Sequence, residues 1–491
     1  MRGSILRKLA GESAIYGLSS VLARFINFLF VPIYTVMLST GSYGIATEFL
    51  AYIAILQVLL TLGLETGCFN FANKRDQPNK VFSNALVTVG SLSIICFIAI
   101  TVFSKDIAGW MGYDGFGYVI VYIGSILAVD SFTSILFARL RYQNKALKFA
   151  FFKGIKILSE TAFNFLLFFG IPAYFKTHPD SLLANFISLT PDFTYIIFAI
   201  FLSGIVSLII FIPDIIALRF TFDKRLWKDM MFYSLPLMIA GLPGIINDTI
   251  DRPLFRFFTP DGLEWNSELG IFQAGVKIAT LMMLFIQMFR YAAEPFFFSR
   301  EGKEKSKEEY AMVMEHFTAL SMFVFLGITL FIDIIALIIG KDFRAGMDIV
   351  PIMLISYVIL GMNFNVSMWY KLSGKTKYAI YITAAALPVT LAINIIFMPI
   401  YSYHAAAWAH LASYSIMFVL SVFIGRKHYP IPYNWKRILI FVSSGIALYL
   451  ISILFSGMVP VFKYLVHTIL IIIFVLIYLK VEKINLWRLK S

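Results

Sequence analysis

The sequence has 491 residues, of which 59% are hydrophobic and 14% are charged, and its net charge is +13. A soluble protein carries about a quarter charged residues, so this composition excludes a soluble enzyme and leaves no room for a soluble domain. The basic residues lie in short loops between apolar runs, where they indicate orientation in a membrane and not a nucleic-acid partner.

Apolar segments follow one another along the whole chain. Each is long enough to cross the core of a bilayer as a helix, and a helix satisfies its backbone hydrogen bonds within itself. The predicted fold class is therefore all-α, a polytopic membrane protein with about fourteen transmembrane helices. The predicted segments are 13–38, 43–72, 81–103, 116–138, 150–174, 191–218, 230–258, 269–298, 310–339, 349–370, 378–397, 403–424, 438–455 and 459–479.

The connections alternate between basic and nearly neutral. Lys and Arg are frequent at both termini and after every even-numbered segment. The other side holds only Lys105, Lys176, Lys341, Arg344 and Lys463. Because cytoplasmic loops carry the excess of Lys and Arg, we expect a bacterial inner-membrane protein with both termini in the cytoplasm.

Two short matches indicate an internal duplication. Arg24 is followed by Pro32, and Arg252 is followed by Pro260 at the same spacing; the stretch 43–45 then matches 269–271. Transporters are often built from such repeats. We therefore expect two pseudo-symmetric six-helix lobes, followed by two C-terminal helices, with boundaries at 1–218, 219–425 and 426–491.

Several basic residues lie deep in the predicted helices, where a charge is costly and indicates function. Arg24 and Lys277 have no obvious acidic partner on their own helices. Segment 230–258 is interrupted by proline and glycine, and a broken helix that carries charge is typical of a transport pathway. In this segment Arg252 and Arg256 follow Asp248 at spacings of four, with Asp251 beside them.

The remaining buried charges divide into predicted pairs and predicted single acids. Lys156 with Glu160, and Arg290 with Glu294, stand four apart and are predicted to pair along one helix face. Glu48 and Asp130 are predicted to be unpaired. We take Arg24, Arg252, Lys277, Arg256 and Arg290 as candidate substrate-binding residues, and Glu48, Asp130, Asp248 and Asp251 as candidates for ion coupling.

Metal binding, ATP coupling and enzymatic catalysis have little support in the sequence. We find no cluster of metal ligands and no phosphate-binding glycine loop, so we expect no metal, no cofactor and no ATP coupling on this chain. An ion gradient of H+ or Na+ would then drive transport. We expect no catalytic residues and no enzyme.

Four stretches resemble one family. These are 17–32 with its central Arg24, 247–252, 270–272, and 290–295. They are similar to the Wzx-type polysaccharide-unit flippases of the MOP exporter superfamily, which also contains MATE exporters and lipid II flippases. The resemblance implies alternating access between two lobes around a basic cavity. The implied substrate is an undecaprenyl-pyrophosphate-linked oligosaccharide, moved from the cytoplasmic to the periplasmic leaflet, with membrane lipids and the polysaccharide polymerase machinery as partners.

Three alternatives stay open at this point. A MATE-like drug/ion antiporter would use acids such as Glu48, Asp130, Glu160 and Asp248 for cationic drugs. A lipid II flippase would use the same phosphate chemistry with a different glycan. A membrane glycosyltransferase or ligase is disfavoured, because the loops are too short for an active-site lobe outside the membrane.

The predicted orientation can be tested with reporter fusions. A reporter after Lys176 is expected in the periplasm and one after Lys303 in the cytoplasm, because Lys303 lies in a basic connection and Lys176 does not. Enzymatic reporters that are active on only one side of the membrane measure this directly. The topology is wrong if both fusions report the same side.

Overall fold

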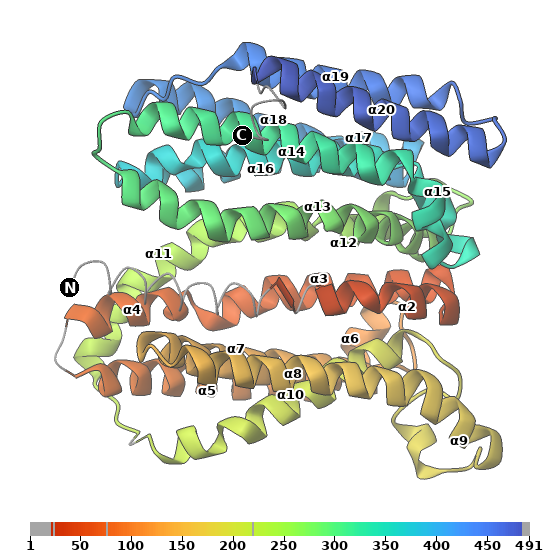
Figure 1. Cartoon of the computed structure of the whole chain (residues 1–491). Helices are drawn as coiled ribbons and strands as arrows, with labels where there is room; N and C mark the ends of the chain where they lie inside the picture. The colour runs from red at the N-terminus through yellow and green to blue at the C-terminus, as the bar shows by residue number, and fades with distance from the viewer. Residues whose placement is uncertain (1–20, 23–24, 75–76, 219, 484–491) are drawn as a thin grey trace. The chain divides into compact units, whose positions relative to one another are not determined.

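The computed structural model describes residues 21–22, 25–74, 77–218 and 220–483. These residues form helices and turns, and no strand occurs among them. The chain divides into two compact units (Figure 1). The first unit contains Met1–Phe257 and Leu263–Gly270, and the second contains Phe258–Gly262 and Ile271–Ser491.

The first unit is a bundle of long helices with short helices in its connections. α7 packs on α3, α5 and α10, and α11 packs on α3 and α4. The elements are α2 (Val31–Met37), α3 (Thr40–Thr61), α4 (Leu64–Lys74), α5 (Pro78–Val102), α6 (Ser104–Trp110), α7 (Gly117–Tyr142), α8 (Ala146–Phe165), the π-helix η1 (Leu166–Gly170), α9 (Ile171–Thr177), the 3-10 helix η2 (Leu182–Asn185), α10 (Phe193–Ile216), α11 (Lys224–Thr249) and α12 (Asp251–Phe258).

The second unit begins within α13 and is built around α18, which packs on α16 and α17, and around α14, which packs on α16, α19 and α20. Its elements are α13 (Trp265–Arg300), α14 (Ser306–Leu330), α15 (Ile332–Ile335), the 3-10 helices η3 (Ala336–Ile338) and η4 (Lys341–Met347), α16 (Val350–Leu372), α17 (Lys377–Tyr401), α18 (Tyr403–His428), α19 (Trp435–Ile453) and α20 (Pro460–Val481).

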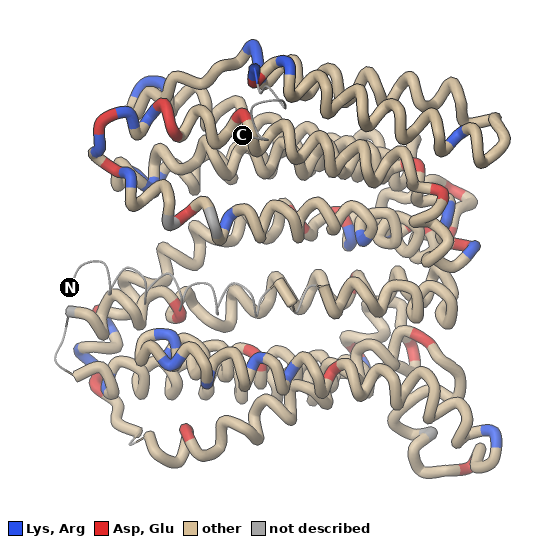
Figure 2. The backbone as a smooth tube through the Cα atoms, in the orientation of Figure 1, with Lys and Arg blue, Asp and Glu red and all other residues tan. Residues whose placement is uncertain are grey.

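The predicted fold class is confirmed. Within the described residues, thirteen helical segments are long and apolar enough to cross a membrane, and Phe25–Met37 forms a shorter apolar helix. Charged residues lie mostly in connections and at helix ends, and long stretches of helix carry none (Figure 2). Residues 13–20 and 23–24 of the predicted first segment, 13–38, lie outside the described residues.

The compact units do not coincide with the predicted lobes. α11 and α12 fall beyond residue 218, yet they belong to the first unit together with the first residues of α13. α11 packs on α3, α4 and α5, and Arg256 of α12 is hydrogen-bonded to Glu48 of α3, which accounts for this grouping. The lobe boundaries at 218 and 425 stay predictions.

The second predicted segment, 43–72, is broken at its centre. Leu62 and Gly63 both have positive φ, at 51° and 68°, and they separate α3 from α4. α11 passes close to this break, so that a Cβ atom on Gly63 would lie 2.5 Å from the carbonyl oxygen of Ser234. Only glycine combines this backbone conformation with this close approach.

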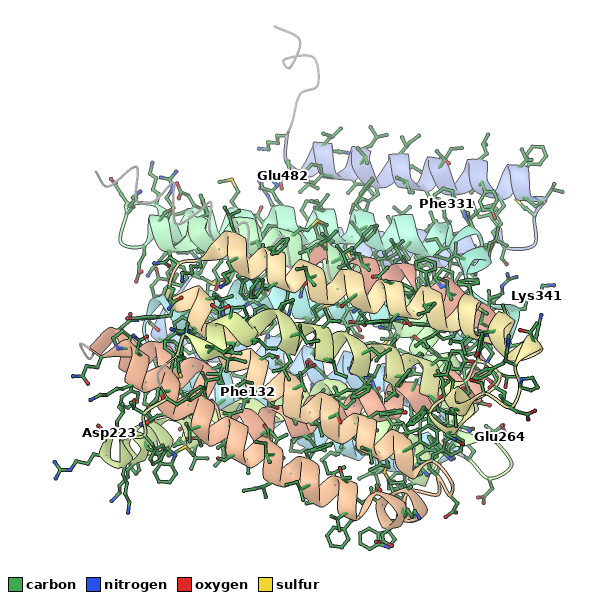
Figure 3. The ribbon with its side chains drawn as sticks, turned by 90° about the horizontal axis from the view of Figure 1, so that it is seen from below. Phe132, Asp223, Glu264, Phe331, Lys341 and Glu482 are labelled. Atoms are coloured by element: carbon green, nitrogen blue, oxygen red, sulfur yellow. The ribbon has the colours of Figure 1, made fainter. Side chains whose placement is uncertain are left out.

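Two side chains of α5 hold the start of α11. Ser83 Oγ donates to the carbonyl of Thr221 and accepts from its amide, both at 2.7 Å. Asn84 exchanges the same two bonds with the backbone of Asp223, both at 2.9 Å. Asp223 (labelled in Figure 3) also caps α11 by accepting from the amides of Arg225 and Leu226. The linker after α10 is therefore fixed to α5.

The C-terminal helix pair is attached to the second unit by charge. Arg437, near the start of α19, donates to Glu315 of α14 at 2.9 Å and to Glu482 at 3.3 Å. Glu482 directly follows α20 (Figure 3). One arginine thus joins three helices at one end of the unit.

Candidate functional site

Glu48 and Arg256 form a two-point ion pair in the first unit. Arg256 Nε donates to Glu48 Oε1 at 2.9 Å, and Nη2 donates to Oε2 at 2.8 Å. Glu48 lies on α3 and is fully buried, whereas the Arg256 side chain on α12 is 19% exposed. Parallel bonds of this kind are the strongest geometry available to arginine and a carboxylate.

Neighbouring groups saturate both partners. Tyr113 Oη donates to Glu48 Oε2 at 2.5 Å, and Tyr52 Oη donates to Oε1 at 3.1 Å. Arg256 Nη1 donates to the carbonyl of Met111 at 2.7 Å, and the guanidinium carbon lies 4.1 Å from the centre of the Trp265 ring. Within this network, the positive charge of Arg256 is neutralised by Glu48 of the same protein.

Tyr113 is held as a hydrogen-bond donor. It lies between α6 and α7, and burial raises the pKa of its phenol, with the charge of Glu48 raising this pKa further. A protonated phenol can donate to the carboxylate, which is the role seen here. The prediction that Glu48 is unpaired was wrong, because its partner lies on another helix, 208 residues away in sequence.

Arg252 differs from Arg256, although both lie on α12. Arg252 Nη1 donates to the carbonyl of Thr47 at 3.5 Å, which is the one hydrogen bond of this side chain to the described residues. Its Nε is buried and has no hydrogen-bond partner among the described residues. A guanidinium has five N–H donors, so Arg252 keeps donors available for an anion.

The other predicted residues of this segment are placed differently. Asp251 is 1% exposed at the start of α12, and Asp248 is exposed near the end of α11. Both make further interactions within the protein. Lys277 lies half-buried on α13 in the second unit and also has a partner. Arg24 lies outside the described residues.

Asp130 and Lys156 form an ion pair between α7 and α8. Lys156 Nζ lies 2.5 Å from Asp130 Oδ1, and both side chains are less than one-fifth exposed. Lys153, one turn earlier, has no acid at ion-pair distance among the described residues, and its ammonium lies 5.6 Å from the centre of the Phe137 ring. Asp130 was predicted to be unpaired and Lys156 to pair with Glu160. Both predictions were wrong, because the neighbouring helix supplies the partner.

A second basic cluster occurs in the second unit. Arg290 Nε lies 3.7 Å from Glu294 Oε2, which confirms the predicted pair, and Lys371 Nζ lies 2.8 Å from Glu294 Oε1. Both cations lie 4.9 Å from the centre of the Phe364 ring. Two cations therefore share one carboxylate, and the Arg290 side chain is 50% exposed.

Sequence reasoning missed Lys371 and Tyr113. Lys371 ends α16 and was read as a loop cation that sets orientation, and Tyr113 was not distinguished from the other 24 tyrosines. No signal in the sequence places either side chain beside its acid. Among the described residues, no group of three or more His, Cys, Asp or Glu side chains could hold a metal ion.

The Asp130–Lys156 pair predicts a specific pattern of stabilities. Asp130→Asn leaves two lysines without an acid and is expected to lower the free energy of unfolding by about 1–3 kcal/mol, between the costs for exposed and buried pairs. Adding Lys156→Met should recover most of this loss. Unfolding of the purified protein in detergent measures both.

The control is Asp214→Asn, which removes a carboxylate from the more exposed pair with Lys148 and should cost less. If the double variant loses as much stability as the two single variants combined, Asp130 and Lys156 are not coupled.

The comparisons with known proteins agree with this architecture. Residues 9–301 match the family model described as polysaccharide biosynthesis protein. Lipid II flippase MurJ, solved in an inward closed conformation, is similar with a TM-score of 0.72 and 14% identity, over 96% of this chain and 99% of that chain. No curated protein matches the sequence.

Two MATE transporters share the fold with lower TM-scores. An inward-facing MATE family transporter of the MOP superfamily has a TM-score of 0.57 and 16% identity, over 89% of this chain and 95% of that chain. The Vibrio cholerae MATE transporter VcmN in its bent form has a TM-score of 0.53 and 12% identity, over 91% of this chain and 99% of that chain. The protein is thus a multi-pass membrane protein that shares its fold with a lipid II flippase and with MATE transporters, and it belongs to the polysaccharide biosynthesis protein family.

Proposed function

We propose that this protein moves an undecaprenyl-pyrophosphate-linked oligosaccharide from the cytoplasmic to the periplasmic leaflet of the bacterial inner membrane. Membership of a polysaccharide biosynthesis family and the similarity to a lipid II flippase support this proposal. Transport proceeds by alternating access of two lobes, 1–218 and 219–425, to which the helix pair 426–491 is attached. Both termini lie in the cytoplasm.

The spare donors of Arg252 carry the substrate argument. A pyrophosphate that leaves water needs compensating cations, and the planar guanidinium fork suits its oxygens. Arg256 has the same chemistry, but Glu48, Tyr113 and the Met111 carbonyl already occupy its donors. Within the described part of the chain, the hydrogen bond that Arg252 makes is its 3.5 Å contact with Thr47. We therefore assign phosphate binding to Arg252 before Arg256.

A second contact with the substrate lies in the second unit. Arg290 and Lys371 together carry one more positive charge than Glu294 can neutralise. The Phe364 ring beneath both cations adds an apolar face of the kind on which sugar rings pack. Arg24 and Lys277 remain proposed contributors to the same basic pathway.

The coupling ion, H+ or Na+, is proposed to act at an acid that it can reach. Glu48 already forms an ion pair with Arg256, and Asp130 forms one with Lys156. A coupling ion would have to displace these side chains. Asp248 is exposed and is the more accessible candidate, with Asp251 beside it on the same segment. Membrane lipids and the polysaccharide polymerase machinery are the expected partners.

Flipping of lipid II is the second candidate function, and the TM-score of 0.72 with the lipid II flippase MurJ favours it. Its substrate also carries a pyrophosphate, so Arg252 would serve equally. A cationic-drug antiporter is less favoured, because Glu48 and Asp130 are neutralised from within the protein. Restoring growth in cells depleted of their lipid II flippase would favour the second candidate, and restoring surface polysaccharide in a flippase-deficient strain would favour the first.

The central test replaces Arg252. Arg252→Ala should weaken substrate binding by about tenfold to a hundredfold, since a charge-assisted hydrogen bond contributes roughly 1.5–3 kcal/mol. Surface polysaccharide should be lost, and lipid-linked units should accumulate on the cytoplasmic leaflet. Arg252→Lys should restore part of the export, because it keeps the charge but loses the planar fork.

The matched control is Arg141→Ala. Arg141 is another helix-borne arginine of the first unit, 3.5 Å from Glu65, and it is not proposed to contact substrate. It should retain export at a normal protein level. Normal export by Arg252→Ala, at the wild-type amount of inserted protein, would contradict the substrate assignment.

A further inference from the structure

An apolar groove lies between α17 and α18 in the second unit. Its volume is about 600 Å³, within the range of roughly 300–1,000 Å³ that is typical of pockets for small molecules. The groove reaches the point where the two helices meet, because Tyr401 ends α17 and Tyr403 begins α18. Among the residues that line it are Phe397 and Tyr401 of α17 and His404, Trp408 and Ala412 of α18.

The groove is a surface that lipid covers. α17 and α18 are both long and apolar enough to cross a membrane, and Phe397, Tyr401 and Trp408 are 43%, 59% and 53% exposed. Trp and Tyr are enriched where the hydrocarbon of a bilayer meets its headgroups. An acyl chain therefore fits the apolar part of the groove, and the groups at its polar end determine which lipid supplies that chain.

A carboxylate lies at this polar end. His404 Nε2 lies 2.7 Å from Asp348 Oδ2, and Tyr403 Oη donates to the same oxygen at 3.3 Å. An ionised carboxylate only accepts hydrogen bonds, so the imidazole is the donor. A phenol and a neutral imidazole do not cancel the negative charge. Asp348 Oδ1 has no hydrogen bond or ion pair to the described residues, and the Asp348 side chain is 46% exposed.

Tyr401 supplies a hydrogen-bond donor beside this acid. Its ring lies 6.5 Å from that of Phe397, and its phenol makes no hydrogen bond within the described part of the chain. A free carboxylate oxygen attracts an ammonium, and a phenol can donate to a phosphate. An ethanolamine phospholipid carries both of these groups in one headgroup. The carboxylate would repel a pyrophosphate, which has no ammonium, so the groove does not suit a polyprenyl pyrophosphate.

We propose that this groove binds a phospholipid whose headgroup carries a primary ammonium. One acyl chain lies between α17 and α18, the ammonium donates to Asp348 Oδ1, and the phosphate accepts from the Tyr401 phenol. None of the proposed substrate-binding residues lines the groove, so this site is independent of what the protein carries. Because Asp348 lies two residues before α16, the bound lipid joins the start of α16 to the α17–α18 pair.

The first test measures headgroup preference. The full-length protein, freed of native lipid in detergent, is mixed with phosphatidylethanolamine, phosphatidylcholine or phosphatidylglycerol of identical acyl chains, and native mass spectrometry measures binding. The ethanolamine lipid should bind about tenfold more tightly, because choline has no N–H to donate and the glycerol headgroup has no cation. Equal affinity for the three lipids, or a preference for phosphatidylglycerol, would overturn the proposal.

Asp348→Asn tests the assignment of the ammonium. It keeps the size of the side chain but removes the charge, so the affinity for phosphatidylethanolamine should fall to that for phosphatidylglycerol. The matched control is Asp342→Asn, which removes another exposed carboxylate from the neighbouring 3-10 helix η4 and should keep the preference. A preference that survives Asp348→Asn, or that disappears equally in Asp342→Asn, contradicts the assignment.

Ala412→Phe tests the acyl-chain site. Ala412 is half-buried and lines the groove, so a phenyl ring there should fill it and weaken the binding of all three lipids alike. Ala392→Phe adds the same ring at an exposed position of α17 outside the groove and should leave binding unchanged. Undiminished binding by Ala412→Phe would reject the groove as the lipid site. The headgroup comparison uses the unaltered protein, so it decides where a variant fails to fold.

Discussion

The ion pair between Arg256 and Glu48 determines how α12 lies against α3. A carboxylate that is fully buried in a membrane bundle has no water to stabilise its charge, so the protein must supply every partner. Two phenols and a guanidinium do so here, and they come from α3 itself, from the connection after α6 and from α12. The position of each of these segments is constrained by one acidic side chain.

The same constraint recurs at two further acids of the helices. Asp130 is matched by Lys156 from the next helix, and Glu315 is matched by Arg437 from the C-terminal pair. Arg252 does not fit this pattern, because its guanidinium is only loosely engaged by a backbone carbonyl. A buried arginine with one weak partner costs stability, which agrees with the proposed role of Arg252 in binding an anion.

The sequence predicted the helices far better than their partners. Membrane spans are determined by local composition, so the apolar segments correspond to helices such as α5, α10 and α16 within a few residues. Pairing depends on which neighbour packs where and on how each helix is rotated. Hence Lys156 was assigned to Glu160 on its own helix, although Asp130 on α7 holds it, and Lys371 was not connected to Glu294 at all. The break at Leu62–Gly63 also escaped notice, because it depends on the close passage of α11.

The long sequence separation of Glu48 from Arg256 has a consequence for synthesis of the protein. The chain emerges from the ribosome in order, at about 5–20 residues per second, so roughly 10–40 seconds pass between the two residues. Throughout that time the α3 carboxyl must be accommodated without its cation. Tyr52 emerges with it, and Tyr113 follows 65 residues later, so phenol donors reach Glu48 well before the guanidinium does. The two tyrosines thus give this acid hydrogen-bond partners while the rest of the bundle is still being made.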